Sequence, residues 1–512
     1  EGSWTREASG VKEKTITGLV NGDIIYARLY DGTSSGKYAN IEVMDKIAPT
    51  ATIKLSGTTV EIGGTLTAEV TQTDNESGIN ISQTKWVLNT EAGNIGTEVS
   101  KYTGGTFTKT SETITIPTTT GGTYYLHVLT VDNAGNKKEI ISEKIEITSV
   151  PNYWKKTTST DPEWYNYGTE VNAPKLGTGM TPIVYEGANK PTEKKWANAI
   201  TEDGSMWVWI PRYAYSITSG YHSSTAGNIE IEFMKGLTNE TSTGRTTFQN
   251  ASGQGNWNIH PAFNYGTTVS GLWVAKFEAS RSNATSSSAG SNNTIKIQPG
   301  VQSWRSITVN DIYTNCLNYN KTLNSHMMKN DEWGAVAYLS KSKYGKNAEV
   351  DINSDSSYYT GGGSGNAYVT NVGQSTTGTV HGVYDMSGGA WEYVAAYVNN
   401  GNSNLTNYGS SLVNGDAKTK NVYSKGSSDS RDNNYSANSG KYGDAVYETS
   451  ANGNSSSSSW YGDYSNFPIT SNPFFLRGGY YDGGTSAGVF SFNGDNGNGS
   501  CYDSFRPVLA AL

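Results

Sequence analysis

Short strand-like runs, separated by turn signals about every ten residues, dominate the stretch 48–148. Ala51 to Leu55 and Leu66 to Val70 alternate apolar and polar residues, as expected of strands with one buried face. Lys85 to Leu88 and Tyr124 to Leu129 are further runs of strand-forming residues. About seven short strands over roughly 100 residues predict a β-sandwich for 48–148.

Three short motifs narrow this prediction. Ala48 to Thr50, Asp74 to Ile79 and Val131 to Asn136 resemble the bacterial immunoglobulin-like repeats of surface proteins. The resemblance implies an immunoglobulin-like domain over 48–150 that serves as a spacer. Asp74, Glu76 and Asp132 offer the hard oxygen ligands that suit Ca²⁺, so a structural calcium ion is one interpretation. The same residues favour turns, which is the interpretation we prefer.

Residues 1–47 show a similar pattern on a smaller scale. Thr15 to Leu19 and Ile24 to Tyr30 are short strand-like runs on either side of Asn21-Gly22, a dipeptide that favours a hairpin turn. Only about three or four strands fit into this length. We therefore expect a partial immunoglobulin-like β domain here.

The bulk composition limits the partners of the chain. With 512 residues, two to four domains are expected. Charged residues make up 16% and the net charge is −8, which argues against a nucleic-acid partner. No apolar run reaches the roughly 18–20 residues of a membrane span. The sequence starts at Glu1 without Met, so we expect any membrane or pilus attachment to lie in a missing N-terminal segment.

The chain has two cysteines, Cys316 and Cys501, which are too few for a disulfide framework or a Cys-x-x-Cys metal knuckle. They could form one bridge, but two isolated thiols are favoured.

The third region, 151–512, opens with aromatic strands at Met206 to Tyr213 and Leu272 to Glu278. Lys329 to Ser342 has apolar residues at helical spacing, and a shorter helix is predicted near Ile307. Ser, Asn, Gly and Tyr dominate 399–465, which we interpret as a loop-rich insertion ordered by packing.

Four segments of this region resemble, in the same order, the formylglycine-generating-enzyme branch of the C-type lectin fold. They are His326 to Gly334, Gly382 to Tyr393, Phe475 to Tyr480 and Ser504 to Pro507. The resemblance implies a chain that is mainly β, with an α+β lectin-fold head over 151–512.

Independently of the resemblance, Arg477 and Arg506 lie in or beside apolar strands. If buried, their charges need carboxylate or carbonyl partners. Glu392 and Glu332 are candidate partners, and we expect Trp391 and Trp333 to belong to the core.

The catalytic residues of that branch do not carry over. Its oxidases hold copper with two nearby cysteines in the C-terminal segment, and this chain has only Cys501 between Arg477 and Arg506. Its iron-dependent relatives need a histidine cluster. None of the five histidines stands in a His-x-Glu or His-x-x-x-His spacing that would indicate such a cluster. They are His127, His222, His260, His326 and His381. We therefore expect no enzyme, no catalytic residue, no metal in the head and no cofactor, a structural calcium ion aside.

Two alternatives stay open. One is an enzyme on the same fold, either a formylglycine-type oxidase or a hydrolase. The other is a calcium-dependent carbohydrate-binding lectin, because Asp351, Asn353 and Asp355 alternate like the start of a calcium loop. Ser356 and Gly362, however, stand where such a loop needs Gly and Glu.

The C-terminal tail resembles the variable proteins of diversity-generating retroelements. In that system adenines are mutated during reverse transcription, so that Asn codons become codons for Tyr, Asp, Ser, Gly or Cys. Ala487, Val489, Phe490 and Phe492 are interleaved with such residues and resemble an invariant strand. The predicted ligand-binding residues are Tyr480, Tyr481, Asp482, Ser486, Ser491, Asn493, Asp495, Asn496, Asn498, Ser500, Cys501, Tyr502 and Asp503.

The sequence thus predicts a surface-displayed receptor that binds a protein or glycan on another cell or host. The segments from Met206 to Gly345 and around Trp391 also resemble surface proteins of gut Firmicutes and their prophages. That resemblance implies an extracellular location on a cell surface or pilus, or alternatively on a virion.

Overall fold

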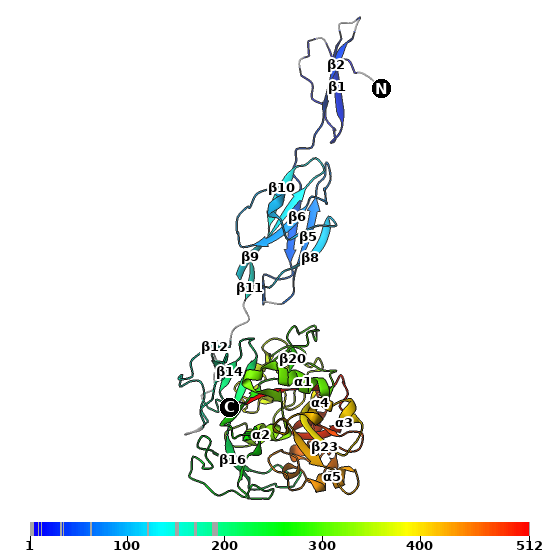
Figure 1. Ribbon diagram of the computed structural model, residues 1–512. Coiled ribbons are helices and arrows are strands. Elements are labelled where there is room, and N and C mark those ends of the chain that lie inside the picture. The colour runs from blue at the N-terminus through cyan, green and yellow to red at the C-terminus, as the bar shows by residue number, and fades with distance from the viewer. Residues whose placement is uncertain are drawn as a thin grey trace. The chain divides into compact units, whose positions relative to one another are not determined.

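The computed structural model describes residues 5–510 except 9, 12, 31–32, 34, 62–63, 120–121, 149–152, 168–171 and 187–192. The chain is mainly β, and its strands form several separate sheets (Figure 1). It divides into two compact units, Glu1–Asn152 and Tyr153–Leu512. The division falls close to the boundary expected at 150, while residues 1–47 are grouped with the region that follows them.

The first strands of the chain form a two-stranded hairpin. β1 (Ile24–Tyr30) pairs antiparallel with β2 (Ser35–Glu42). The strand expected at 15–19 is not formed, so the prediction of a hairpin around Asn21-Gly22 is wrong. These two residues do make a turn, in which the Asp23 amide donates to the Val20 carbonyl at 3.1 Å. The turn precedes β1, and β1 finds its partner further along the chain instead.

Residues 50–148 form a β-sandwich, as the strand spacing predicted. In β5, Leu66, Ala68 and Val70 are buried on alternate positions, so one face of its sheet points into a core shared with the other sheet. Of the described strands of this unit, none pairs with a strand of the other unit. The first sheet contains β3 (Thr50–Leu55), β5 (Leu66–Thr73) and β8 (Ser111–Ile116). The second contains, in order, β4 (Thr59–Glu61), β11 (Ile145–Thr148), β9 (Gly122–Val131), β6 (Lys85–Asn89) and β7 (Gly105–Thr106), with β10 (Lys137–Ile141) also paired to β9.

The second unit contains an antiparallel sheet that joins its first strands to its last. β30 lies between β19 and β22, so the C-terminal strand is an interior strand of this sheet. In order, the sheet contains β12 (Trp154–Lys156), β13 (Thr181–Tyr185), β14 (Asn198–Ile200), β15 (Met206–Pro211), β19 (Gly271–Ala275), β30 (Pro507–Ala510) and β22 (Ser325–Met327). Smaller sheets pair β16 (Tyr213–Ile217) with β17 (Ile229–Phe233) and β18 (Asn258–Ile259), and β20 (Ser280–Arg281) with β21 (Ile295–Lys296).

A second large sheet carries the C-terminal segment that the sequence singled out. Its long strand β23 pairs with β24, β27 and β29, and β27 in turn pairs with β28. The strands are β24 (Asn421–Ser424), β23 (Trp391–Asn399), β27 (Phe474–Gly478), β28 (Gly488–Asp495), β26 (Ser465–Asn466), β25 (Asn454–Ser455) and β29 (Asp503–Phe505).

Both predicted helices are present. α1 (Val309–Tyr319) begins after Thr308, whose side chain accepts a hydrogen bond from the Asp311 amide, an N-cap that satisfies one free donor. α2 (Asn330–Ser340) is buried on all sides. Three shorter helices lie in the predicted insertion at 399–465: α3 (Asn404–Asn407), α4 (Ser410–Asn414) and α5 (Arg431–Ala437).

Aromatic contacts order this insertion, as predicted. The ring of Tyr423 lies 4.5 Å from that of Phe475, and Tyr435 lies 5.9 Å from Phe467. None of the helices in the described part of the chain has the length and apolar character needed to cross a membrane.

Candidate functional site

Two buried arginines, Arg477 and Arg506, lie beneath the candidate site, and Arg506 is the one that forms an ion pair with a carboxylate. It follows β29, and its Nε donates to Glu392 Oε2 at 2.7 Å while its Nη2 bonds the other carboxylate oxygen. Nη1 and Nη2 also donate to the carbonyls of Ala275 at 2.9 Å and Tyr384 at 3.0 Å. Burial lowers the pKa of Arg506, but the Glu392 carboxylate outweighs burial and raises it. The predicted partner Glu392 is therefore confirmed.

Arg477, in β27, has no carboxylate partner. Its Nε donates to the Ser491 carbonyl at 2.8 Å, and Nη1 donates to Asn330 Oδ1 at 2.6 Å. Nη1 and Nη2 also reach the carbonyls of Asp444 at 2.9 Å and Ala445 at 3.0 Å. A fully buried cation is thus satisfied by main-chain and amide oxygens.

Trp333 connects the two arginines. The guanidinium carbons of Arg477 and Arg506 lie 5.5 and 5.9 Å from the centroid of its ring, distances typical of cation–π contacts. The predicted partner Glu332 is wrong for both arginines. It bonds His326 Nε2 at 2.9 Å and the Lys329 amide at 2.8 Å, because it closes a capping box at the start of α2.

Strand β28 supplies the core beneath the site. Val489, Phe490 and Phe492 are buried, as expected for the strand between the predicted ligand-binding positions. Ser491 was expected to face solvent and is buried too, so this part of the prediction is wrong. The reason is that both faces of β28 are covered at this point, and a strand covered on both faces has no solvent side.

Asp503 is the second correction. It lies in β29 and is 3% exposed, so it does not point to solvent. Burial, followed by the nearby charge of Asp495, raises the pKa of the Asp503 carboxyl to about 7. Asp503 therefore belongs to the support of the site rather than to its surface.

Three tyrosines gather at the surface above this framework, where they lie near the buried Tyr358 and the half-buried Arg305. Ring centroids of Tyr480 and Tyr481 are 5.7 Å apart, as are those of Tyr480 and Tyr502. Tyr481 also packs edge-on against Tyr358, with centroids 4.9 Å apart. The Arg305 guanidinium lies 3.8 Å from the Tyr358 ring centroid. We refer to Arg305, Tyr358, Tyr480, Tyr481 and Tyr502 as the aromatic face.

The backbone beneath the aromatic face is fixed by the sheet. The amide of Tyr481 donates to the Gly389 carbonyl at 2.8 Å, and the Tyr502 carbonyl accepts from the Trp391 amide at 2.9 Å. Gly479 has a φ of +78°, and a Cβ there would lie 2.5 Å from the Cα of Ala487. Only glycine permits the chain to leave β27 and turn into Tyr480 in this way.

The other predicted ligand-binding residues form the loops around the aromatic face. Asp482 and Cys501 are exposed, and Tyr502 is 49% exposed. Several side chains close turns: Asp495 accepts from the Gly497 amide at 3.1 Å and Asn496 from the Asn498 amide at 2.9 Å. The half-buried residues of the predicted set are Tyr480, Tyr481, Ser486, Asn493, Asp495, Asn496, Asn498 and Ser500.

Sequence reasoning missed Arg305 and Tyr358. They lie more than a hundred residues before the tail, outside the segments that carried the resemblance. Tyr358 is 8% exposed and Arg305 is half-buried. Arg305 Nη1 donates to the carbonyl of Cys501, which ties it to the tail. No local signal distinguishes these two residues from their neighbours, so only the fold reveals them.

The calcium loop considered at 351–362 is not supported by the geometry. Asp351 pairs with the Lys346 ammonium at 2.6 Å, and Asn353 turns inward to donate to Asp385 Oδ1 at 3.0 Å. Both cysteines have free thiols; Cys316 is buried and Cys501 exposed. Among the described residues, the one close group of three or more acidic, histidine or cysteine side chains is Asp45, Asp74 and Asp132.

Comparisons with known proteins do not identify a family for this chain. Neither a scan against family models nor a search of curated proteins returns a match. One solved structure with some similarity comes from work on the promiscuous specificity of carbohydrate-binding modules from the β-sandwich superfamily. It is 17% identical, with a TM-score of 0.17, over 42% of this chain and 83% of that one. A TM-score this low does not indicate a common fold.

Proposed function

We propose that the chain is a surface-displayed binding protein that contacts its ligand through the aromatic face. In this proposal Tyr153–Leu512 is a C-type-lectin-fold head of the formylglycine-generating-enzyme type, and the β-sandwich is an immunoglobulin-like spacer. The observation that carries the proposal is the gathering of Tyr480, Tyr481 and Tyr502 at one surface, where Tyr481 packs against the buried Tyr358. Such clusters supply large, rigid contact area at low entropic cost, as they do in antibody paratopes.

The loops around the aromatic face support binding of a varied ligand. Asp482, Ser500 and the asparagines beside them offer donors and acceptors that adapt to different partners. The framework below is complete without them, since Arg477 and Arg506 bond β-strand carbonyls, Asn330 and Glu392. Loop identity can therefore change while the core stays the same.

We further propose that a diversity-generating retroelement varies these positions. The structure narrows the predicted set, because Ser491 and Asp503 are buried and a substitution there would disturb the support. The eleven positions that reach the surface remain as proposed ligand-binding residues. A near-copy of the coding segment for Arg477 to Arg506 in the neighbouring DNA, mismatched at adenines, would test this part directly.

A binding role is proposed over an enzymatic one. The exposed Cys501 thiol has no second cysteine in its segment, and Cys316 lies buried in α1. A copper site built from paired thiolates therefore has no basis in the tail. We propose an extracellular location, on a cell surface, pilus or virion, and a ligand that is a protein or glycan on another cell or host.

The proposal is tested with the full chain, labelled with a fluorophore, on a glycan array and on a panel of intact gut bacteria and host epithelial cells. The triple variant Tyr480→Asn, Tyr481→Asn, Tyr502→Asn should lose at least about tenfold in apparent affinity, since clustered aromatic residues dominate interface energies. The matched control is the double variant Tyr26→Asn, Tyr38→Asn in β1 and β2, which alters exposed tyrosines of the other unit and should bind normally. Unchanged binding of the triple variant would refute the aromatic face.

A further inference from the structure

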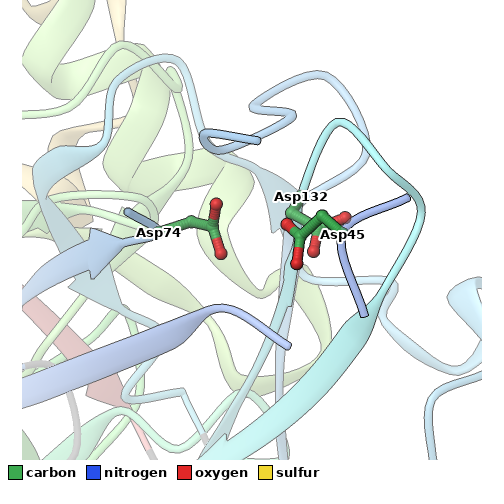
Figure 2. Close-up of side chains that lie close together, drawn as sticks. All are labelled: Asp45, Asp74 and Asp132. Atoms are coloured by element: carbon green, nitrogen blue, oxygen red, sulfur yellow. The ribbon is translucent and has the colours of Figure 1, made fainter. Parts of the chain in front are cut away.

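Three aspartates from separate parts of the first unit meet at one point. Asp45 follows β2, Asp74 follows β5, and Asp132 follows β9. Each offers a carboxylate oxygen, and these oxygens all lie within 4.8 Å of one another. Figure 2 shows the carboxylates of Asp45 and Asp132 side by side, with that of Asp74 turned toward them.

Hydrogen bonds hold the three segments together around the aspartates. The Asn133 amide donates to the Gly78 carbonyl at 2.9 Å, and Asn133 Nδ2 donates to the Ser77 carbonyl at 2.8 Å. These bonds fasten the loop after β9 to the loop after β5. Asn136 Nδ2 donates to the Asp45 carbonyl at 3.0 Å, which adds the third segment. The three carboxylates are therefore placed by the backbone and do not meet by chance rotation of long side chains.

The negative charge of this group has no positive partner. Asp45 is 4% exposed and Asp132 is fully buried. Over the described residues, no lysine or arginine forms an ion pair with any of the three aspartates. Burying carboxylates without a cation costs several kcal/mol, because each loses its hydration.

One oxygen of the group is left without any hydrogen bond. Asp132 accepts from Asn136 at both oxygens, and Asp74 Oδ1 accepts from three amides of its own loop. Asp45 Oδ1 accepts from the Ile47 amide at 2.8 Å, but the buried Oδ2 has no partner. The Ser77 hydroxyl, in the loop whose amides bond Asp74, is also buried without a partner. Buried oxygens left free beside two further carboxylates indicate a missing ligand.

We infer that Asp45, Asp74 and Asp132 bind a calcium ion. Calcium takes six to eight oxygen ligands at about 2.3–2.6 Å, so two of its ligands can be up to about 5 Å apart, in agreement with the spacing of this group. Carboxylates, carbonyls, a hydroxyl and water form an all-oxygen set that calcium accepts, whereas zinc prefers nitrogen and sulfur. Asp74 and Asp132 close their turns and bind the ion with the same side chains.

The structure changes the ligand set that the sequence indicated. Glu76 was a candidate ligand beside Asp74 and Asp132, but it is exposed, and Asp45 takes its place in the group. Asp45 was missed because it lies about thirty residues before the motif, on the segment that leads from β2 to β3. The ion would therefore tie that segment to two loops of the sandwich.

The experiment measures calcium binding and thermal unfolding of the full chain after removal of metal with a chelator. Calcium chloride should bind with one ion per chain in titration calorimetry and raise the lowest melting transition by several degrees, because a ligand of the folded state stabilises it. Magnesium chloride at the same concentration should have a much smaller effect, since magnesium demands six ligands at about 2.1 Å.

The variant Asp45→Asn separates ion binding from folding. It removes one buried charge, so the metal-free variant should unfold at the same temperature as the metal-free parent or higher. Its calcium affinity should fall at least about tenfold, since affinity follows the number of charged ligands. Asp355→Asn in the other unit is the matched control and should leave both measurements unchanged. The inference fails if calcium gives no heat and no shift, or if Asp45→Asn binds calcium as the parent does.

Discussion

Strand β28 and three tyrosines of the aromatic face, Tyr480, Tyr481 and Tyr502, come from one short stretch of chain, but their aromatic side chains differ in burial. Phe490 and Phe492 of β28 are 3% and 0% exposed, whereas Tyr502 is 49% exposed. Aromatic residues in the strand fill the core, and those in the flanking turns remain at the surface. This segment therefore contains residues that fill the core and, separately, residues that our proposal assigns to ligand binding.

The arginines explain how this separation is maintained. Arg477 and Arg506 lie at the two ends of the segment, and each has its charge satisfied by the sheets. The exposed side chains of the turns between them are not needed to satisfy either guanidinium. Substitutions in the framework should cost stability, and substitutions in the aromatic face should cost binding alone.

The largest expected effect is that of Arg506→Gln. The variant leaves Glu392 as a buried carboxylate without its cation, and loss of one member of a buried ion pair costs about 3–5 kcal/mol. We expect a loss of this size in the free energy of unfolding, measured by denaturant titration of the full chain.

Arg305→Gln is the matched comparison, because it makes the same change in an arginine of the aromatic face. It should alter the free energy of unfolding by less than about 1 kcal/mol while weakening ligand binding. If Arg506→Gln and Arg305→Gln lose the same free energy of unfolding, the buried framework and the aromatic face do not have separate roles.

An effect of similar size but opposite sign is expected for Asp503→Asn. The folded chain holds the Asp503 proton up to about pH 7, whereas an unfolded aspartate loses it near 3.8. The folded state of the parent therefore loses stability as the pH rises from about 4 to about 7, and the penalty is complete above that window. At pH 8 the variant should be more stable by about 4 kcal/mol, and at pH 4 it should equal the parent.

Unfolding curves at the two pH values measure this effect, with Asp482→Asn as the control. Asp482 is exposed, so its replacement should not change stability at either pH. A stabilisation by Asp503→Asn that is the same at pH 4 and pH 8 would mean that proton binding at this carboxyl is not the cause.

The smallest expected effect on stability is that of the triple variant Tyr480→Asn, Tyr481→Asn, Tyr502→Asn. Surface substitutions usually change the free energy of unfolding by no more than about 0.5 kcal/mol each. Calorimetric melting of the second unit should therefore change little, although we expect the variant to lose binding. A loss of several kcal/mol would place these tyrosines in the framework.

The parts of the fold that were predicted correctly depend on local patterns. The alternating runs at Ala51 and Leu66 gave the sandwich strands, and the helical spacing around Trp333 gave α2. Glu392 was correctly predicted as a candidate partner of the buried arginines, and it pairs with Arg506, whereas the other candidate, Glu332, pairs with neither.

The errors arise where partners are distant in sequence. Ser491 was expected at the surface because its codon can be reached from an Asn codon, but it lies in an interior strand that is covered on both faces. Arg305 and Tyr358 join the aromatic face through tertiary packing alone, which no local pattern records. The turn at Asn21-Gly22 is present, but β1 pairs with β2, which follows it, and not with the residues before the turn. The sequence of the turn alone does not determine which segment pairs with the strand.

The interior position of β30 has a consequence for how incorrect copies of the chain are removed. A chain cut short anywhere between Tyr480 and Asp503, by a stop codon or a shifted reading frame, lacks both Arg506 and β30. It leaves Glu392 unpaired and opens a gap between β19 and β22, so neither large sheet can close. Such a product would remain unfolded and be degraded by proteases. Under the proposed variation of the surface turns, folding of the residues that follow them would reject products that are not read through to β30.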